Sequence, residues 1–155
     1  MITRKHVGLG LLVLAMMLNV ACGAKIVRGA TPIVRMSELS HDGQTITLLL
    51  GMRNLNGVEL TIQHIDFSLS VDDRTLFTHS GPANTSIVAN GTETWTIDVE
   101  ESDSSQQLLD KLQQGEVNSL PYSLEGTITS AEDGKLRFQQ EGHIYPVPGR
   151  PGQFR

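Results

Sequence analysis

Alternating hydrophobic and polar residues fill most of the chain after residue 31, and they predict β-strands. Between Thr45 and Met52 every even-numbered residue is hydrophobic, while the odd-numbered positions carry threonine, leucine or glycine. Because successive side chains of a strand point to opposite faces, this pattern is typical of a strand with one buried face. Residues 94–99 and 122–129 show the same alternation, and residues 32–36 are predicted to form a first strand.

The alternation changes phase within residues 58–71. Hydrophobic residues occupy even positions up to Ile62 and odd positions from Ile65 onward. A flat strand cannot place both sets on one face, because the direction of its side chains alternates strictly. We therefore predict a β-bulge, or a strand that passes from one sheet to the other, near Gln63 and His64.

One segment has helical spacing instead. Its leucines at positions 108, 109 and 112 fall on one face of a helix. Ser104 and Gln107 are predicted to form a capping-box pair at the start, and Gly115 suits the C-terminal cap. The segment therefore predicts a helix of roughly ten residues within a chain that otherwise favours strands.

Turn residues separate the predicted strands. Asn, Asp and Gly, which tolerate positive φ, occur together at residues 54–57, 72–73, 90–91 and 133–134. About seven strands at this spacing, with one short α-helix, predict an all-β, antiparallel β-sandwich over residues 32–146. Residues 147–155 continue a run rich in proline and glycine, so we expect a flexible C-terminal tail there.

The first 21 residues have the organisation of a secretory signal peptide. Arg4 and Lys5 precede an uncharged apolar run over residues 7–18, which is too short to span a bilayer as a helix. The run ends at Val20-Ala21-Cys22, which resembles the lipobox of bacterial lipoproteins. We therefore expect a signal peptide over residues 1–21, lipidation of Cys22 and a tether over residues 22–31. An ordinary signal peptide with a cysteine near its cleavage site is the alternative.

The position and surroundings of Cys22 also bear on localisation and charge. Gly23 follows it, which resembles sorting to the outer membrane, so we expect a lipid-anchored protein of the cell envelope that faces the periplasm. Removal of residues 1–21 would change the net charge of the chain from −5 to −7. An acidic domain repels nucleic acid and anionic lipid surfaces alike. We therefore expect no nucleic-acid partner, and we expect membrane contact through the lipid.

The order of these features resembles the late embryogenesis abundant type 2 family, whose domain is named WHy for water stress and hypersensitive response. The resemblance covers about residues 31–146. It rests on Asn54-Leu55-Asn56, where the family typically has Asn-Pro-Asn, and on residues 60–71, 86–91 and 121–127. It implies a fibronectin-III-like or immunoglobulin-like sandwich and a role in protection during dehydration.

The family turn motif of Asn54, Leu55 and Asn56 is the main candidate site that the resemblance marks. The resemblance does not assign it a role. Asparagine side chains cap exposed backbone groups in tight turns and also tolerate left-handed backbone. A structural role is therefore favoured, and a ligand site is the alternative.

Patterns that would indicate catalysis or metal binding are absent from the sequence. The four histidines after residue 22 form neither an H-x-x-x-H nor an H-E-x-x-H pattern, and the acidic pairs lack the spacing of a calcium loop. There is no G-x-S-x-G motif and no glycine-rich phosphate loop. We expect a protein that is not an enzyme, with no metal, no cofactor and no small-molecule substrate. The aromatic residues are expected in the core: Phe67, Trp95, Tyr122 and Phe138.

Two functions remain open from the sequence. The first is a lipid-anchored stress-protection domain whose hydroxyl-rich strand faces shield weakly bound proteins or the membrane surface. The second is an envelope adaptor that binds a partner protein by strand addition at a sheet edge. The residues expected on the hydroxyl-rich faces are Thr45, Thr47, Thr94, Thr96, Ser123, Thr127 and Thr129.

Overall fold

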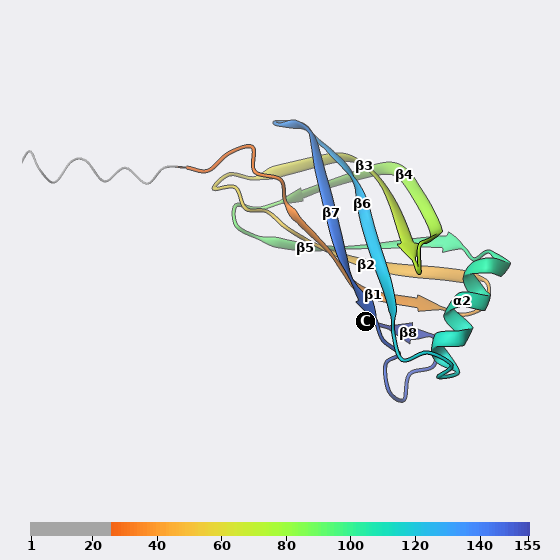
Figure 1. Cartoon of the computed structure of the whole chain (residues 1–155). Coiled ribbons are helices and arrows are strands. Elements are labelled where there is room, and N and C mark those ends of the chain that lie inside the picture. Colours follow the sequence, from red (N-terminus) through yellow and green to blue (C-terminus); the bar gives the residue numbers. More distant parts are fainter. Residues whose placement is uncertain (1–25) are drawn as a thin grey trace, which may run out of the picture.

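Two four-stranded antiparallel sheets face each other in the computed structural model, which describes residues 26–155 (Figure 1). The first sheet has the strand order β5-β2-β1-β8, and the second has the order β4-β3-β6-β7. This arrangement confirms the predicted all-β sandwich with one short helix. The predicted signal peptide and Cys22 lie outside the described residues. The elements are β1 (Ile33–His41), β2 (Thr45–Arg53), β3 (Leu60–Val71), β4 (Arg74–Ile87), β5 (Thr92–Glu100), α2 (Asp103–Gln113), β6 (Leu120–Ser130), β7 (Gly134–Ile144) and β8 (Gln153–Phe154).

The hydrophobic core lies between the two sheets and is built from the alternating residues of their strands. On β2, the side chains of Ile46, Leu48 and Leu50 are fully buried, while the intervening residues remain partly exposed. Each fully buried side chain of this size contributes about 1.5–3 kcal/mol to stability. Of the aromatic residues expected in the core, Phe67, Tyr122 and Phe138 are buried.

The predicted phase change in β3 is a β-bulge. In the pairing of β3 with β6, Ile62 faces Ser130 and His64 faces Thr129, so that Gln63 is the extra residue. The pairing of β3 with β4 shifts register at the same point, but there the extra residue lies on β4. Ile62 and Ile65 on either side of the bulge are both fully buried. The bulge therefore lets one strand present its even-numbered and its odd-numbered hydrophobic residues to the same core.

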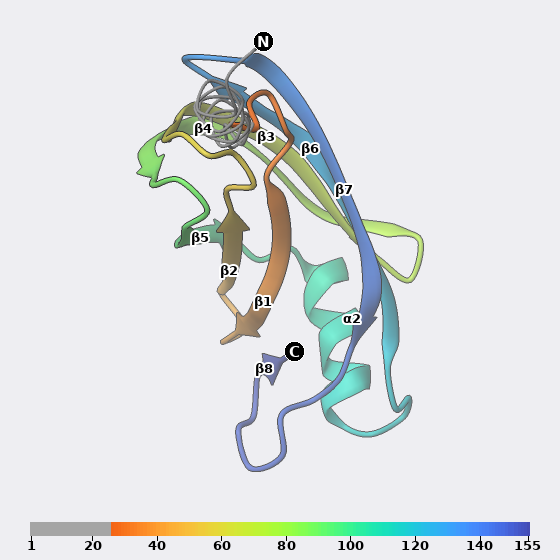
Figure 2. The same ribbon diagram turned by 90° about the vertical axis from the view of Figure 1, so that its left-hand side faces the viewer.

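Helix α2 lies at one end of the two sheets (Figure 2). Its three leucines at positions 108, 109 and 112 are buried against the core. The N-cap is Ser102 and not the predicted Ser104, because the Oγ of Ser102 accepts the hydrogen bond of the Ser105 N–H at 3.2 Å. The C-terminal prediction is confirmed, since Gly115 has φ +76° and its N–H donates to the carbonyl of Leu112.

The C-terminal segment is not the flexible tail that its composition predicted. Residues 147–155 turn back, and β8 pairs with β1 through Leu39 with Phe154 and Ser40 with Gln153. The side chain of Phe154 is only 1% exposed. The prediction was wrong because prolines shape the turn before β8 and do not interrupt β8 itself, which also raises the number of strands to eight. Gly152 has φ +75°, and a Cβ on it would lie 2.3 Å from the carbonyl oxygen of His41, so only glycine fits this turn.

Trp95 is only partly buried, in contrast to the prediction. It lies on the edge strand β5, where its ring packs edge-on against His79 of β4 with ring centroids 5.4 Å apart. His79 in turn stacks on Phe67, also at 5.4 Å. The three rings form a stack that joins the edges of the two sheets.

The pH dependence of stability should reveal the partly buried position of His79. Burial lowers the pKa of His79, because desolvation disfavours the charged ring. The unfolded chain then binds a proton more readily than the folded chain, so stability should fall as the pH decreases from about 7.5 to about 5.5. Urea midpoints over this range should show the decrease, and His79→Gln should have a smaller decrease than the unmodified chain. An equal decrease in both proteins would contradict this assignment.

Candidate functional site

The two asparagines of the family turn motif lie in the loop between β2 and β3, and both are buried. Asn54 is 0% exposed and Asn56 is 1% exposed, whereas Leu55 between them is 38% exposed. A buried amide group is unfavourable unless hydrogen bonds replace those that it made with water. The partners of these two side chains therefore define what the motif does.

Asn54 ties its own loop to the end of β4. Its Nδ2 lies 2.8 Å from the carbonyl oxygen of Val58, 3.0 Å from that of Ile87 and 3.2 Å from that of Val88. Its Oδ1 accepts a hydrogen bond from the Asn56 N–H at 2.8 Å. One side chain thus connects the β2–β3 loop with the turn between β4 and β5.

Asn56 holds the N-terminal segment of the described chain. The N–H of Ala30 donates to the Oδ1 of Asn56 at 2.8 Å, and the Nδ2 of Asn56 donates to the carbonyl of Ala30 at 3.0 Å. This side chain pairs with the backbone as a neighbouring strand would. The N–H of Gly57 donates to the carbonyl of Val27 at 3.0 Å, which adds a third bond to the same segment.

We name this arrangement of Asn54, Asn56, residues 27–30 and residues 87–91 the asparagine clasp. Every polar atom of the two asparagine side chains has a partner within the chain, so none is free to bind a ligand. The geometry favours the structural role of the motif over the ligand site. It also means that the predicted tether is held against the domain from Val27 onward.

Three polar side chains on the outer face of β3 and β4 are close together but do not form a catalytic triad. Ser80 Oγ donates to Asp66 Oδ1 at 2.6 Å, and this hydrogen bond lowers the pKa of Asp66. His64 Nε2 lies 3.3 Å from Ser80 Oγ and 3.2 Å from the same oxygen of Asp66. In a triad the histidine takes the proton of the serine through one nitrogen and is oriented by the carboxylate through the other. Here a single nitrogen faces both groups, and the serine donates to the carboxylate.

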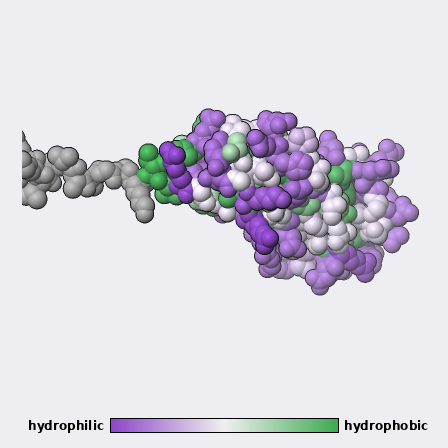
Figure 3. Space-filling view, turned by 90° about the horizontal axis from the view of Figure 1, so that it is seen from above, coloured by the Kyte–Doolittle hydropathy of each residue, from purple (hydrophilic) through white to green (hydrophobic). Residues whose placement is uncertain are grey.

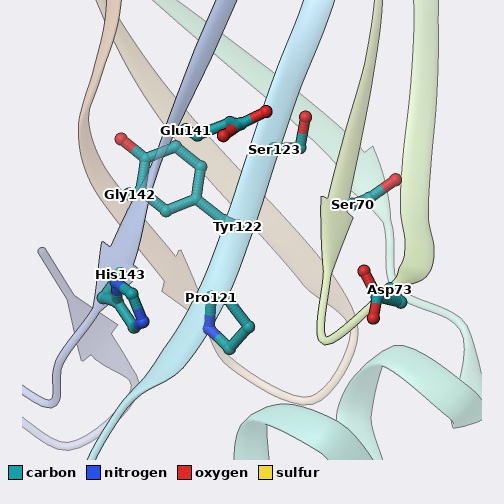
Figure 4. A pocket seen from close by; sticks show the side chains of 8 residues that line it. All are labelled: Ser70, Asp73, Pro121, Tyr122, Ser123, Glu141, Gly142 and His143. Atoms are coloured by element: carbon teal, nitrogen blue, oxygen red, sulfur yellow. The ribbon is translucent and has the colours of Figure 1, made fainter.

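An open depression lies on the outer face of β3, β6 and β7 (Figure 4). Tyr122 is buried beside Gly142, where a Cβ would come within 2.8 Å of its ring. Burial raises the pKa of the Tyr122 phenol, which keeps it neutral. Asp73, in the turn between β3 and β4, and Glu141 of β7 lie on opposite sides of the depression. The remaining lining residues are Ser70, Pro121, Ser123 and His143.

A buried contact between a histidine and a glutamate, which the sequence analysis did not detect, lies beside β8. His41 Nδ1 is 3.0 Å from Glu101 Oε1, and their side chains are 5% and 1% exposed. The contact is close, but its direction is not that of a hydrogen bond. The His41 ring stacks on Phe154 with centroids 5.7 Å apart. No local signal in the sequence connects these residues, because each comes from a separate strand end.

The residues expected on hydroxyl-rich faces lie on the outer surfaces of the two sheets. Thr94 and Thr96 on β5 are exposed, and Thr47 on β2 donates to Asp98 at 2.6 Å. Within residues 26–155 no three His, Cys, Asp or Glu side chains gather closely enough to hold a metal ion. In the same range no helix is long and apolar enough to cross a membrane. The other residues expected on these faces are partly exposed: Thr45, Ser123, Thr127 and Thr129.

Comparison with known proteins gives a family and a set of similar folds. A sequence model described as late embryogenesis abundant protein (LEA_2) matches residues 49–142. No curated protein sequence matches the chain significantly. The solution structure of AT1g01470 from Arabidopsis thaliana is 15% identical with a TM-score of 0.51, and the match covers 85% of this chain and 93% of that one. The solution structure of At2g46140.1, described as a late embryogenesis abundant protein, is 18% identical with a TM-score of 0.50, and covers 92% and 85% respectively.

The two solved structures show a common fold at these low identities. The sequence match carries the family assignment, because it covers more than half of the chain. It extends from Leu49 in β2 to Gly142 in β7, and it includes the asparagines of the clasp. The chain therefore belongs to the late embryogenesis abundant type 2 family.

Proposed function

We propose that this protein is a non-catalytic, lipid-anchored envelope protein whose domain protects proteins or membrane surfaces when water becomes scarce. The observation that carries the proposal is the distribution of side chains on the sandwich. Hydrophobic residues are directed into the core, while hydroxyl groups are spread over the outer faces of both sheets. A surface of this kind forms hydrogen bonds with many partners and has no need of a fixed pocket.

The physical basis is replacement of lost water. As a protein or lipid surface dries, its polar groups lose hydrogen bonds, and exposed hydroxyl groups such as those of Thr94 and Thr96 supply substitutes. A net charge of −7 after removal of residues 1–21 keeps the protein molecules apart from one another. The cluster of His64, Asp66 and Ser80 also favours a protein without catalysis, because the serine donates to the carboxylate and no second histidine nitrogen is oriented by it.

Protection can be measured with the Cys22→Ser chain, which cannot be lipidated. We expect this protein to reduce the aggregation of an unrelated enzyme through drying or freeze–thaw cycles, without ATP or metal. An equal mass of an inert acidic protein is the control for crowding. Equal protection by the two proteins would count against a specific role and favour the adaptor described below.

The hydroxyl groups themselves can be tested by a change that keeps their shape. Thr94→Val with Thr96→Val replaces two exposed hydroxyls by methyl groups on β5, where valine is favourable. We expect this variant to unfold at the same urea concentration but to protect the enzyme less well. Light scattering after rehydration measures the protection. Unchanged protection by this variant would show that the hydroxyl groups of this face do not carry the activity.

The lipid anchor is supported by the charged start, the apolar run and the position of Cys22. Mass spectrometry of the protein extracted from membranes should show a diacylglyceryl-modified cysteine at the N-terminus. The Cys22→Ser variant should lose this modification and leave the membrane fraction. A precursor that retains residues 1–21, or a soluble unmodified product, would overturn the anchor while leaving the protective role to be tested separately.

An adaptor that binds a partner protein by strand addition is the second candidate, and a groove between β1 and β7 favours it. Residues 31–35 and 137–140 line this groove. β8 covers β1 only at Leu39 and Ser40, so the first half of β1 is an open edge. The Met36 N–H there is taken by the side chain of Gln140 at 3.0 Å. One stoichiometric partner that copurifies from membranes would favour this function over protection.

A further inference from the structure

Four exposed aliphatic side chains gather at the end of the sandwich that carries the asparagine clasp. Ile26 is 57% exposed, Val27 is 51%, Leu55 is 38% and Val88 is 60%. They come from the N-terminal segment, the β2–β3 loop and the β4–β5 turn, which the clasp joins. Figure 3 shows hydrophobic surface at the point where the described chain begins. We name these four residues the apolar tip.

The clasp keeps the apolar tip in a fixed arrangement. Leu55 lies between the two buried asparagines, and the carbonyl of Val88 accepts from Asn54 Nδ2. The carbonyl of Val27 accepts from the Gly57 N–H, and Ile26 lies against Gly57. The buried amide groups of Asn54 and Asn56 therefore hold the backbone in place, and the aliphatic side chains of the tip remain exposed to solvent. A cluster of this kind is typical of an interaction surface, whereas single exposed aliphatic residues are ordinary.

The charges around the apolar tip are of both signs. Arg28 and Arg53 adjoin it in the chain, and so does Glu59. The Asp133 carboxylate lies 3.8 Å from the position that a Cβ on Gly29 would take. Because the charges are mixed, attraction to an anionic surface is weak here, and the contact that the tip favours is apolar.

Chain length decides which apolar surface the tip can reach. Cys22 precedes Ile26 by four residues, and four extended residues span at most about 14 Å. The part of the tether that can move freely is short, because the clasp holds the segment from Val27 onward. If Cys22 carries lipid, the tip is thereby held within reach of the lipid headgroups.

We propose that the apolar tip docks into the headgroup region of the membrane that holds the lipid on Cys22. In this orientation the β2–β3 loop and the β4–β5 turn contact the bilayer, and α2 lies at the end of the domain that faces away from it. The two acyl chains of the diacylglyceryl group hold the protein at the bilayer, and the tip adds a contact that fixes the orientation of the domain on it. This inference rests on the lipid anchor of the proposed function.

The test compares two exposed valines at opposite ends of the molecule. Val88 lies in the tip, and Val117, 37% exposed, lies in the loop after α2. Cys22 is the only cysteine, so in the lipidated chain a Val88→Cys or Val117→Cys substitution provides the only free thiol for a polarity-sensitive fluorophore. Each labelled full-length mature protein is reconstituted into vesicles of phosphatidylcholine, with and without phosphatidylglycerol. Brominated phosphatidylcholine serves as the quencher.

We expect the fluorophore at position 88 to shift to shorter wavelength and to lose most of its emission to the brominated lipid. The fluorophore at position 117 should show neither change. Because the contact is apolar, the signal at position 88 should persist in high salt and without phosphatidylglycerol. Leu55→Asp in the Val88→Cys background should reduce the signal, while Val117→Asp in that background should not.

The outcomes separate the inference from the anchor on which it rests. The mass of the extracted protein reports lipidation of Cys22 independently of the fluorescence. Modified Cys22 with equal signals at positions 88 and 117 would overturn the docking alone and describe a domain that tumbles freely on its lipid. Unmodified Cys22 would overturn the anchor and the docking together. Loss of the signal in high salt would replace apolar docking by charge attraction and so contradict the proposal.

Discussion

Replacing Asn54 with alanine should lower the free energy of unfolding by about 3 kcal/mol. The variant leaves the carbonyls of Val58, Ile87 and Val88 and the N–H of Asn56 without their common partner. Each buried polar group that loses its partner costs about 1–3 kcal/mol, and water that enters the cavity recovers part of the loss. Urea unfolding followed by the fluorescence of Trp95 measures the change.

Two further variants show whether the effect belongs to the clasp. Asn118→Ala changes an exposed asparagine, so it should alter stability by less than about 0.5 kcal/mol. Asn54→Asp keeps the acceptor for Asn56 but directs a carboxylate toward three carbonyl oxygens. It should therefore destabilise at least as much as alanine. An Asn54→Ala variant as stable as Asn118→Ala would refute the structural role of the motif.

The second large effect is expected at the C-terminus. Phe154→Ala should lower the free energy of unfolding by about 3–5 kcal/mol, because a large buried ring is removed and a cavity remains. Phe154 is 1% exposed and stacks on His41. Tyr145→Ala is the matched control, since this nearby aromatic residue is 51% exposed. A loss at Phe154 no larger than that at Tyr145 would indicate a C-terminus that frays in solution, as its composition alone suggests.

The features that sequence predicted correctly depend on local rules. The bulge at Gln63 follows from the phase of hydrophobic residues within one strand, and the turns follow from residues that accept positive φ. Asp72, Asp73 and Asn90 have φ values of 52°, 58° and 57°. In each case the local structure is determined by residues that are adjacent in the chain.

The features that sequence missed depend on residues far apart in the chain. The clasp joins Asn56 to Ala30, 26 residues away, and Asn54 to Val88, 34 residues away. Composition alone predicted a flexible tail, because three prolines precede Phe154 and nothing local shows that β1 has an open edge for it. The error at the helix start has another cause. Ser102, Ser104 and Ser105 are equally good caps by residue type, and packing selects Ser102 when Ser105 bonds to β4.

The pairing of β1 with β8 has a consequence for the kinetics of folding. β1 with β2, β3 with β4 and β6 with β7 are neighbours in sequence and can form early, whereas Leu39 and Phe154 meet only after a closure over most of the chain. Folds rich in such distant pairs form in milliseconds to seconds. Until β8 arrives, β1 is an open edge, and β8 of a second molecule fits it equally well. A high local concentration of copies, such as a lipid anchor on Cys22 would produce, thus favours exchange of this strand between them.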